Sequence, residues 1–294
     1  MAHLAIIGPG AIGCTMLGWL GRSPAHRVFA CARTPFETVT LETPDGVLES
    51  RPTVLTVPAD APVVDWVLVA TKTYDTAGAA EWLRRLTGPR THVAILQNGV
   101  EHLARFAGIV APGMLLPVVV DCPAERIAPG RVRQRGPGRM TVPDSEVGRA
   151  FVALFAGTPL EGLTTSDWRS VAWRKLCLNA AGAVNALTLQ PARIAHDEAV
   201  ANLMRAIVRE AILVGRREGA TLDDALTETV IASYRSAPPD AINSLHADRL
   251  AGRPMEIDAR NGVIVRFGRQ QRISTPVNET VVTLLNAIAS PAKV

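Results

Sequence analysis

Short apolar runs alternate with amphipathic stretches through the first half of the chain. The amphipathic stretch at residues 76–86 has helical spacing, and runs the length of strands cover residues 3–7, 27–31, 65–71, 93–96 and 114–121. Strands that alternate with helices predict βαβ units and a parallel sheet. The run at 65–71 is apolar enough to be buried on both faces of such a sheet.

Three further segments complete the first half. Residues 38–57 alternate weakly around the turn Pro44-Asp45-Gly46 and predict a hairpin. Residues 126–141 are rich in glycine, proline and arginine, and they predict short antiparallel strands whose arginines form a solvated face. Residues 145–156 predict a helix that closes the first domain.

From about residue 166 the strand-like runs stop and helical periodicity takes over. Prolines separate the helical segments, as expected for residues that end helices. The predicted helices cover residues 167–184, 197–218, 222–233, 243–250, 256–269 and 278–289. The second half of the chain is therefore expected to be all-α.

A glycine-rich turn joins the first apolar run to the helix that follows it. In a dinucleotide-binding unit with the pattern G-x-G-x-x-G, Gly8 permits the tight turn, Gly10 admits a pyrophosphate, and Gly13 lets helix and strand pack closely. The helix N-terminus then holds the phosphates through its amides and dipole. Other glycine-rich turns share the pattern, but the flanking strand and helix favour a cofactor site. Its expected residues are Gly8, Pro9, Gly10, Ala11, Ile12 and Gly13.

The end of the second predicted strand indicates which dinucleotide binds. Many NAD proteins carry an acid about 20 residues beyond the first glycines, to bind the ribose hydroxyl. This chain instead has Arg33 and Thr34, with no acid after that strand until Glu37. An arginine fork pairs well with a 2′-phosphate, so Arg33 favours NADP(H) over NAD(H). The alternative is an arginine on a surface loop.

Together these patterns predict an α/β protein with two domains. Residues 1–165 are expected to form a Rossmann-type NADP-binding domain, and residues 166–294 an all-α domain that binds substrate and carries catalysis. Lys72 and Asn98 each follow a predicted strand, at the sheet edge where ligands bind. An Asn-Gly pair is also common in turns, which is the alternative for Asn98.

Composition excludes several classes of protein. The chain has 48% hydrophobic and 20% charged residues, as in ordinary globular proteins, and a net charge of +4 that suits small anionic ligands. Its basic residues are scattered and aromatic residues make up 4%, which argues against nucleic-acid binding. The four cysteines match no metal spacing and are typical of reduced thiols, with a disulfide as the alternative. With no signal peptide or membrane span in the pattern, we expect a cytoplasmic location and no membrane partner.

Polar residues in the helical half suggest chemistry. Lys175 and Asn179 are four residues apart and share one helix face, within an apolar stretch that includes Trp173. A partly desolvated lysine gives up its proton more readily and can act as an acid, unless it reaches the surface instead. Glu256 comes soon after Pro254, where a carboxylate can also cap a helix.

In order and spacing, these features resemble those of the ketopantoate reductases (2-dehydropantoate 2-reductases) over essentially the full length. The matching motifs are G-P-G-A-I-G at residue 8, Thr71-Lys72, Gln97-Asn98-Gly99, W-R-K-L-x-x-N from residue 173, S-L-x-x-D from residue 244, and E-I-D-x-x-N-G from residue 256.

The resemblance implies NADPH-dependent reduction of 2-dehydropantoate to pantoate in pantothenate biosynthesis, with hydride transfer to the C2 ketone. Lys175 matches the catalytic lysine, as general acid, and Glu256 matches the carboxylate that positions the substrate. The implied substrate-binding positions are Asn98, Asn179 and Ser244. The implied cofactor positions outside the glycine turn are Arg33, Lys72 and Asn98.

One position departs from the family pattern. A second asparagine is common four residues beyond the first, where this chain has Ala183. Asn185 is the nearest candidate, and a bulge at Gly182 would return it to the substrate site. Alternatively that contact is absent and the substrate differs.

Two other functions stay open on the sequence alone. One is an NADPH-dependent reductase of another branched 2-oxo acid, because a fold and two catalytic residues do not define the side-chain pocket. The other is a non-catalytic NADPH-binding regulator, against which the retention of Lys175 and Glu256 argues. The oligomeric state is undefined, and a homodimer is compatible with the sequence.

Overall fold

The first strand shows why a central sheet forms in this chain. Along β1 (Ala2–Ile7), Leu4 and Ile6 contribute to one hydrophobic core, whereas Ala5 and Ile7 contribute to another. Strand β6 (Trp66–Val69) alternates between the same two cores and is buried throughout. A strand covered on both faces needs apolar side chains at every position, which confirms the prediction for residues 65–71.

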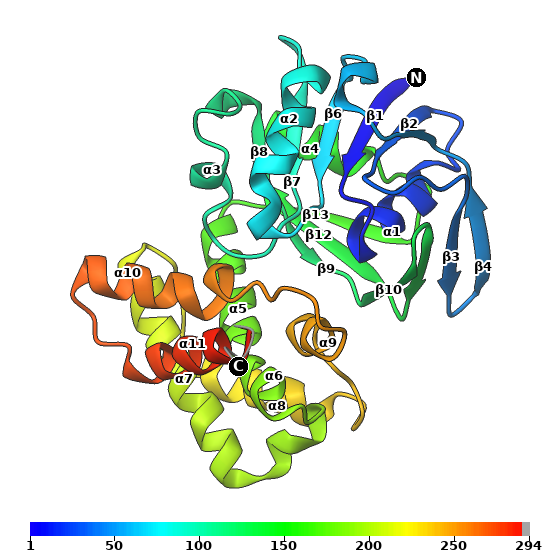
Figure 1. Ribbon diagram of the computed structural model, residues 1–294. Helices are drawn as coiled ribbons and strands as arrows, with labels where there is room; N and C mark the ends of the chain where they lie inside the picture. Colours follow the sequence, from blue (N-terminus) through cyan, green and yellow to red (C-terminus); the bar gives the residue numbers. More distant parts are fainter. Residues whose placement is uncertain (290–294) are drawn as a thin grey trace, which may run out of the picture. The chain divides into compact units, whose positions relative to one another are not determined.

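The computed structural model of the protein describes residues 1–289 (Figure 1). The chain forms two units, Met1–Trp168 and Arg169–Val294. The first is built on a parallel sheet and the described part of the second is helical, so the predicted α/β class is confirmed. Residues 290–294, which the predicted helical domain includes, lie outside the described residues.

The main sheet of the first unit has six parallel strands in the order β5-β2-β1-β6-β7-β8. Its outer members are β2 (His26–Cys31), β5 (Thr53–Leu55), β7 (His92–Ile95) and β8 (Leu115–Pro117). Helix α2 (Thr76–Leu86) covers one face with Ala79, Leu83 and Leu86, which are fully buried. The short helix α3 (His102–Arg105) follows β7.

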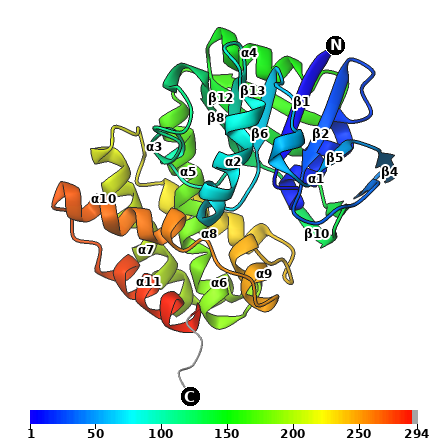
Figure 2. The same cartoon turned by 45° about the horizontal axis from the view of Figure 1, so that its top comes forward.

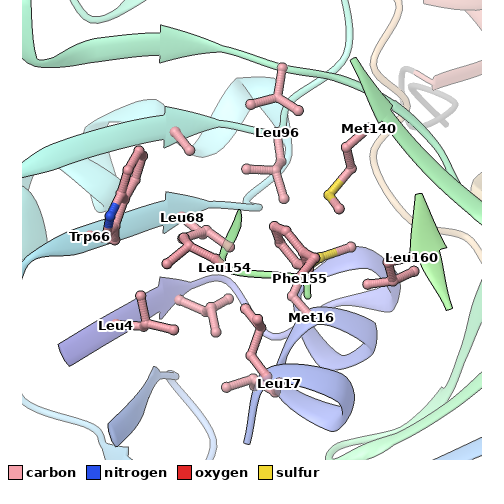
Figure 3. Close-up of a cluster of buried hydrophobic side chains, with 14 of the residues drawn as sticks. Leu4, Met16, Leu17, Trp66, Leu68, Leu96, Met140, Leu154, Phe155 and Leu160 are labelled. Carbon is pink, nitrogen blue, oxygen red and sulfur yellow. The ribbon is translucent and has the colours of Figure 1, made fainter. Parts of the chain in front are cut away.

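Helix α1 (Ala11–Leu20) covers the other face and is itself covered by a second sheet, of order β10-β11-β3-β4. This sheet contains β3 (Val39–Thr43), β4 (Gly46–Ser50), β10 (Ala124–Ala128) and β11 (Arg131–Gln134). Figure 3 shows Met16 and Leu17 of α1 in the core beside Leu4 and Leu68. The antiparallel β3–β4 pair confirms the predicted hairpin, and the β10–β11 pair confirms the antiparallel strands.

The first unit contains a third sheet, and its strands show that two predictions are wrong. Residues 114–121 form two strands that belong to different sheets, β8 in the main sheet and β9 (Val119–Asp121) in the third. The helix predicted at 145–156 is α4 (Glu146–Ala153), and it does not close the unit. The strand β13 (Leu160–Thr165) follows and pairs in parallel with β12 (Gly138–Pro143).

Helices make up the described part of the second unit, as Figure 2 shows from another side. Their bounds are α5 (Trp168–Ala181), α6 (Ala183–Thr188), α7 (Glu198–Arg217), α8 (Leu226–Ser236), α9 (Ser244–Leu250), α10 (Val263–Gln271) and α11 (Pro276–Ala289). Among the described residues, no helix combines the length and apolar character needed to cross a membrane.

Two predicted helices of this unit are interrupted. The segment at 167–184 divides at Gly182, where an added Cβ would lie 2.3 Å from the Tyr234 hydroxyl. The segment at 256–269 becomes an α-helix only at Val263, after a π-helical turn at Asp258–Gly262. Apolar spacing does not distinguish a π-turn from an α-helix, which is why the sequence did not reveal it.

A buried polar network joins three segments of the helical unit. Both carboxylate oxygens of Glu210, on α7, accept hydrogen bonds from the first turn of α11, including 2.7 Å from Asn278 Nδ2 and 2.9 Å from the Val277 amide. Asn261 in the π-helical turn donates to Asn278 Oδ1 at 2.9 Å and to the Ala180 carbonyl at 3.2 Å. Glu210 therefore anchors the start of α11, and through it the π-turn and α5.

Replacing Glu210 by alanine should lower the free energy of unfolding by about 2–4 kcal/mol, because buried amide donors lose their acceptor. Urea denaturation of the purified protein measures this. The control is Glu279→Ala on the same helix α11, whose exposed pairing with Arg269 contributes less than about 1 kcal/mol. Equal losses in the two variants would show that the network does not anchor α11.

Candidate functional site

The carboxyl ends of four strands meet at one edge of the main sheet. Ile7 pairs with Cys31 on one side and with Val69 on the other, and Val69 pairs with Ile95. Parallel strands in this register end level with one another. The glycine turn, Arg33, Lys72 and Asn98 follow these four strands, so they leave the sheet at the same edge. The structure thus brings together the predicted cofactor residues of the first unit.

The three glycines of the turn differ in their surroundings. Gly8 has a φ of 87°, and an added Cβ would lie 2.7 Å from Thr71 Cγ2. A Cβ on Gly13 would lie 2.3 Å from the Gly8 carbonyl oxygen, so helix and strand could not keep their spacing. Around Gly10, by contrast, no atom lies within 4 Å of an added Cβ. Gly8 and Gly13 are required by the fold, whereas Gly10 leaves open space.

That open space lies at the start of α1. Gly10 is the N-cap residue, and neither a side-chain cap nor an acid in the first turn meets the first amides in the described structure. Bare amides at the positive end of a helix bind phosphate oxygens. The residues present therefore fit a pyrophosphate, with Pro9, Ala11 and Ile12 lining the same turn.

Arg33 lies in the loop after β2 with 88% of its side chain exposed. Its guanidinium makes an ion pair of 3.4 Å with Asp75, the residue before α2. The side chain is thus available at the edge that the glycine turn occupies. An exposed pair of this length is weak, so an anionic group on a ligand could replace Asp75.

Gln97 links the loops that carry Lys72 and Asn98. Its Nε2 donates to Thr71 Oγ1 at 3.0 Å and to the Lys72 carbonyl at 3.3 Å. Its Oε1 accepts from Arg105, which also donates to the Asn98 carbonyl at 3.3 Å. Gln97 is 4% exposed and had no predicted role. Its position as a buried polar residue directly after a strand is the signal that could have identified it.

In the helical unit, Lys175 and Asn179 lie one turn apart on α5, as their spacing predicts. Both are half-buried, whereas Leu176 and Cys177 between them are buried, and burial raises the pKa of the Cys177 thiol to about 12. The role of Lys175 as a proton donor stays a prediction.

Ser244 begins α9, and the side chain of the preceding Asn243 caps that helix by accepting from the His246 amide at 3.1 Å. Capping therefore does not occupy the Ser244 hydroxyl. It accepts a hydrogen bond of 2.6 Å from Arg260 Nη2 instead. Arg260 also donates to the Asn179 carbonyl at 3.3 Å.

Arg260 had no predicted role, and its neighbour Glu256 is buried with 3% exposed surface. Burial lowers the pKa of Arg260, and the nearby negative charge of Glu256 opposes that change. Glu256 lies directly before Ile257 and the π-helical turn, and the α-helix α10 begins only at Val263. Three predicted residues, Asn179, Ser244 and Glu256, thus surround one arginine.

Asn185 is placed differently from these residues. It is 1% exposed, and its Nδ2 donates to the carbonyls of Gln190 at 2.9 Å and Pro191 at 3.1 Å. The helix is interrupted at Gly182, where the sequence suggested a bulge. Because both amide protons bind the chain itself, this geometry favours a structural role for Asn185, and its contact with substrate stays a prediction.

Comparison with known proteins identifies the family of the chain. Residues 4–146 match the ketopantoate reductase PanE/ApbA family, and residues 167–289 match the C-terminal domain of that family. The chain belongs to the ketopantoate reductase family. A 2-dehydropantoate 2-reductase of Caulobacter vibrioides is 57% identical to it over 98% of this chain and 100% of that protein.

More distant members of the family also match over almost their whole length. A 2-dehydropantoate 2-reductase of Mycobacterium tuberculosis is 36% identical over 97% of each chain. The crystal structure of a PanE/ApbA family ketopantoate reductase from Ralstonia eutropha is 31% identical, covers 98% of each chain and superposes with a TM-score of 0.89. The match to the family therefore extends over both the sheet unit and the helical unit.

Alanine substitutions in the glycine turn should separate folding from cofactor binding. Gly13→Ala should destabilise the protein by about 1–3 kcal/mol, because its Cβ overlaps the Gly8 carbonyl. Gly10→Ala should leave the melting temperature unchanged. The added Cβ in Gly10→Ala would occupy the space in which the pyrophosphate is expected to bind. NADPH should therefore bind roughly ten-fold or more weakly to this variant. Thermal denaturation and NADPH fluorescence titration measure the two effects, and unchanged NADPH affinity in Gly10→Ala would contradict this placement.

Proposed function

We propose that this chain reduces 2-dehydropantoate to pantoate with NADPH, as a step of pantothenate biosynthesis. The observation that carries the proposal is the full-length, 57% identical match to a protein named 2-dehydropantoate 2-reductase. The positions of the predicted residues support it. Residues 1–165 would form the NADP-binding domain, and residues 166–294 the substrate and catalytic domain.

The cofactor is held by the first unit in this proposal, and NADPH supplies a hydride when bound. The amides at the start of α1 bind the pyrophosphate, and Gly10 leaves room for it. Arg33 pairs with the 2′-phosphate in place of Asp75. Lys72 and Asn98 complete the cofactor residues at the carboxyl edge of the sheet.

The helical unit binds the 2-oxo acid and supplies the proton. As the ketone is reduced, negative charge develops on its oxygen, and the Lys175 ammonium donates a proton to that atom. Glu256 accepts a hydrogen bond from the substrate's hydroxyl group and so orients it. Asn98, Asn179 and Ser244 bind the remaining polar groups. The small anionic substrate suits a chain with a net charge of +4.

One observation favours a second candidate, a reductase of another branched 2-oxo acid. Ala183 stands where the family commonly has its second asparagine, and both amide protons of Asn185 are bound by backbone carbonyls. A site with one polar contact fewer tolerates a less polar substrate. We propose a cytoplasmic location as well, which the buried thiols of Cys14, Cys31 and Cys177 support. A homodimer stays a prediction.

Steady-state NADPH oxidation with 2-dehydropantoate and with other branched 2-oxo acids tests these functions together. We expect the highest kcat/KM with 2-dehydropantoate. A clear preference for another acid would show that 2-dehydropantoate is not the substrate. If no acid led to NADPH oxidation, the function that remains would be that of a non-catalytic NADPH-binding regulator.

Lys175→Met should lower kcat by about 10²- to 10⁴-fold, because the developing alkoxide loses its proton donor. NADPH affinity should stay near that of the wild type. Arg174→Met is the matched control, since Arg174 is exposed on the same helix and donates to the Thr221 carbonyl. Wild-type turnover in Lys175→Met would exclude this lysine as the acid.

Arg33→Ala should raise the KM for NADPH by about ten-fold or more, the effect of losing a charged hydrogen bond. The KM for NADH, which has no 2′-phosphate, should change little. Arg90→Ala serves as control, because Arg90 precedes β7 and so lies toward the opposite edge of the sheet. If Arg33→Ala raised the KM for NADPH and the KM for NADH equally, Arg33 would not bind the 2′-phosphate.

A further inference from the structure

Arg260 is a buried cation that the proposed mechanism does not use. It lies in the π-helical turn Asp258–Gly262 with 2% of its surface exposed. Its Nε has no hydrogen-bond partner among the described residues 1–289. Burying a guanidinium with an unsatisfied donor costs free energy, so its remaining contacts and neighbouring charges have to compensate.

Its two remaining nitrogens bind residues from two different helices. Nη2 donates to Ser244 Oγ, on α9, at 2.6 Å. Nη1 donates to the carbonyl oxygen of Asn179, on α5, at 3.3 Å. One rigid, planar group thus determines the spacing between Ser244 and Asn179. Both are proposed substrate-binding positions.

Acidic groups compensate the charge from several sides. Glu256 precedes the π-turn and Asp248 lies on α9, and the negative charge of these two carboxylates opposes the lowering of the Arg260 pKa by burial. Tyr234, on α8, is a third titratable group near Arg260. Burial also raises the pKa of Tyr234 to about 12, so this phenol is neutral at physiological pH. Asp248 already pairs with Arg253 at 3.0 Å. Of these groups, Glu256 opposes the lowering of the Arg260 pKa most strongly.

The exposure of the two partners indicates how Arg260 acts. Ser244 is exposed, whereas Arg260 behind it is buried. A hydroxyl has one proton, and the Ser244 oxygen accepts from a charged donor, so that proton is left for an anionic acceptor on the exposed side. Arg260 is too deeply buried to meet the substrate itself.

We propose that Arg260 is a positioning residue for the carboxylate end of the substrate. It holds the Ser244 oxygen from behind, so that the Ser244 hydroxyl donates to the carboxylate of the 2-oxo acid, and it keeps α5 in place at Asn179. The inference rests on the proposed function, because it takes the ligand to be a 2-oxo acid.

Kinetics of Arg260→Met, Ser244→Ala and the double variant test this role. Each single variant should raise the KM for 2-dehydropantoate by about ten-fold or more, while the KM for NADPH stays within about two-fold. The double variant should raise the KM by less than the product of the two single effects, because Arg260 acts in part through the Ser244 hydroxyl. Arg269→Met on α10, exposed and paired with Glu279, is the control for loss of a nearby arginine.

A hydroxyl-free 2-oxo acid of the same branching separates the two ends of the substrate. Loss of Arg260 should raise its KM by the same factor as that for 2-dehydropantoate. If the KM rose only for 2-dehydropantoate, Arg260 would act on the hydroxyl end of the substrate, through Glu256. That result would overturn the proposal. Multiplicative effects in the double variant, or equal rises in the KM for NADPH, would also overturn it.

Arg260→Lys covers the case in which Arg260→Met fails to fold, since it keeps the charge. A buried lysine has a lowered pKa, so its KM for the 2-oxo acid should rise as pH increases, whereas arginine keeps the wild type flat. A flat profile in Arg260→Lys at wild-type KM would overturn the proposal. If the wild type reduces no 2-oxo acid, the proposed function fails; if it does and Arg260→Met keeps its KM, only the role of Arg260 fails.

Discussion

The structure of the first unit depends on parallel strands that are buried on both faces and paired in register. Burial on both faces makes residues 4–7 of β1, all of β6 and residues 93–95 of β7 continuous apolar runs, so no polar side chain projects from these segments. Chemistry is thereby confined to the strand ends. Because the ends are level, residues that are far apart in sequence, such as Gly8 and Asn98, reach the same edge. The predicted cofactor residues lie together because the interiors of the strands are buried and the carboxyl ends of the strands are level.

In the helical unit, buried polar groups determine how the helices are placed against one another. Glu210 binds the start of α11, Asn261 binds both Asn278 and α5, and Arg260 joins α5 to α9. Helices could slide along one another if only apolar side chains packed between them. Charged and amide groups that need particular partners prevent this, because each shift leaves a buried group unsatisfied.

Sequence predicted the parts of the fold that rest on periodicity. The strands at residues 3–7 and 65–71, the hairpin around Gly46 and the helix spacing of Lys175 and Asn179 all follow from local patterns. Strand β13 was missed because Gly162 and several exposed residues mask its alternation. Side chains whose role lies in distant contacts, above all Arg260, gave no local signal, since a buried arginine resembles a surface one in sequence.

The ion pair between Arg33 and Asp75 bears on how the cofactor would be recognised. An exposed arginine samples many rotamers, and ordering it on a ligand costs roughly 2 kcal/mol of side-chain entropy. Asp75 restricts the side chain beforehand, so part of that ordering is already in place before a phosphate arrives. The same carboxylate then competes with the phosphate. The preference for NADPH over NADH would thus depend on how much more strongly Arg33 binds the 2′-phosphate than the Asp75 carboxylate. Added salt would weaken both of these ionic contacts.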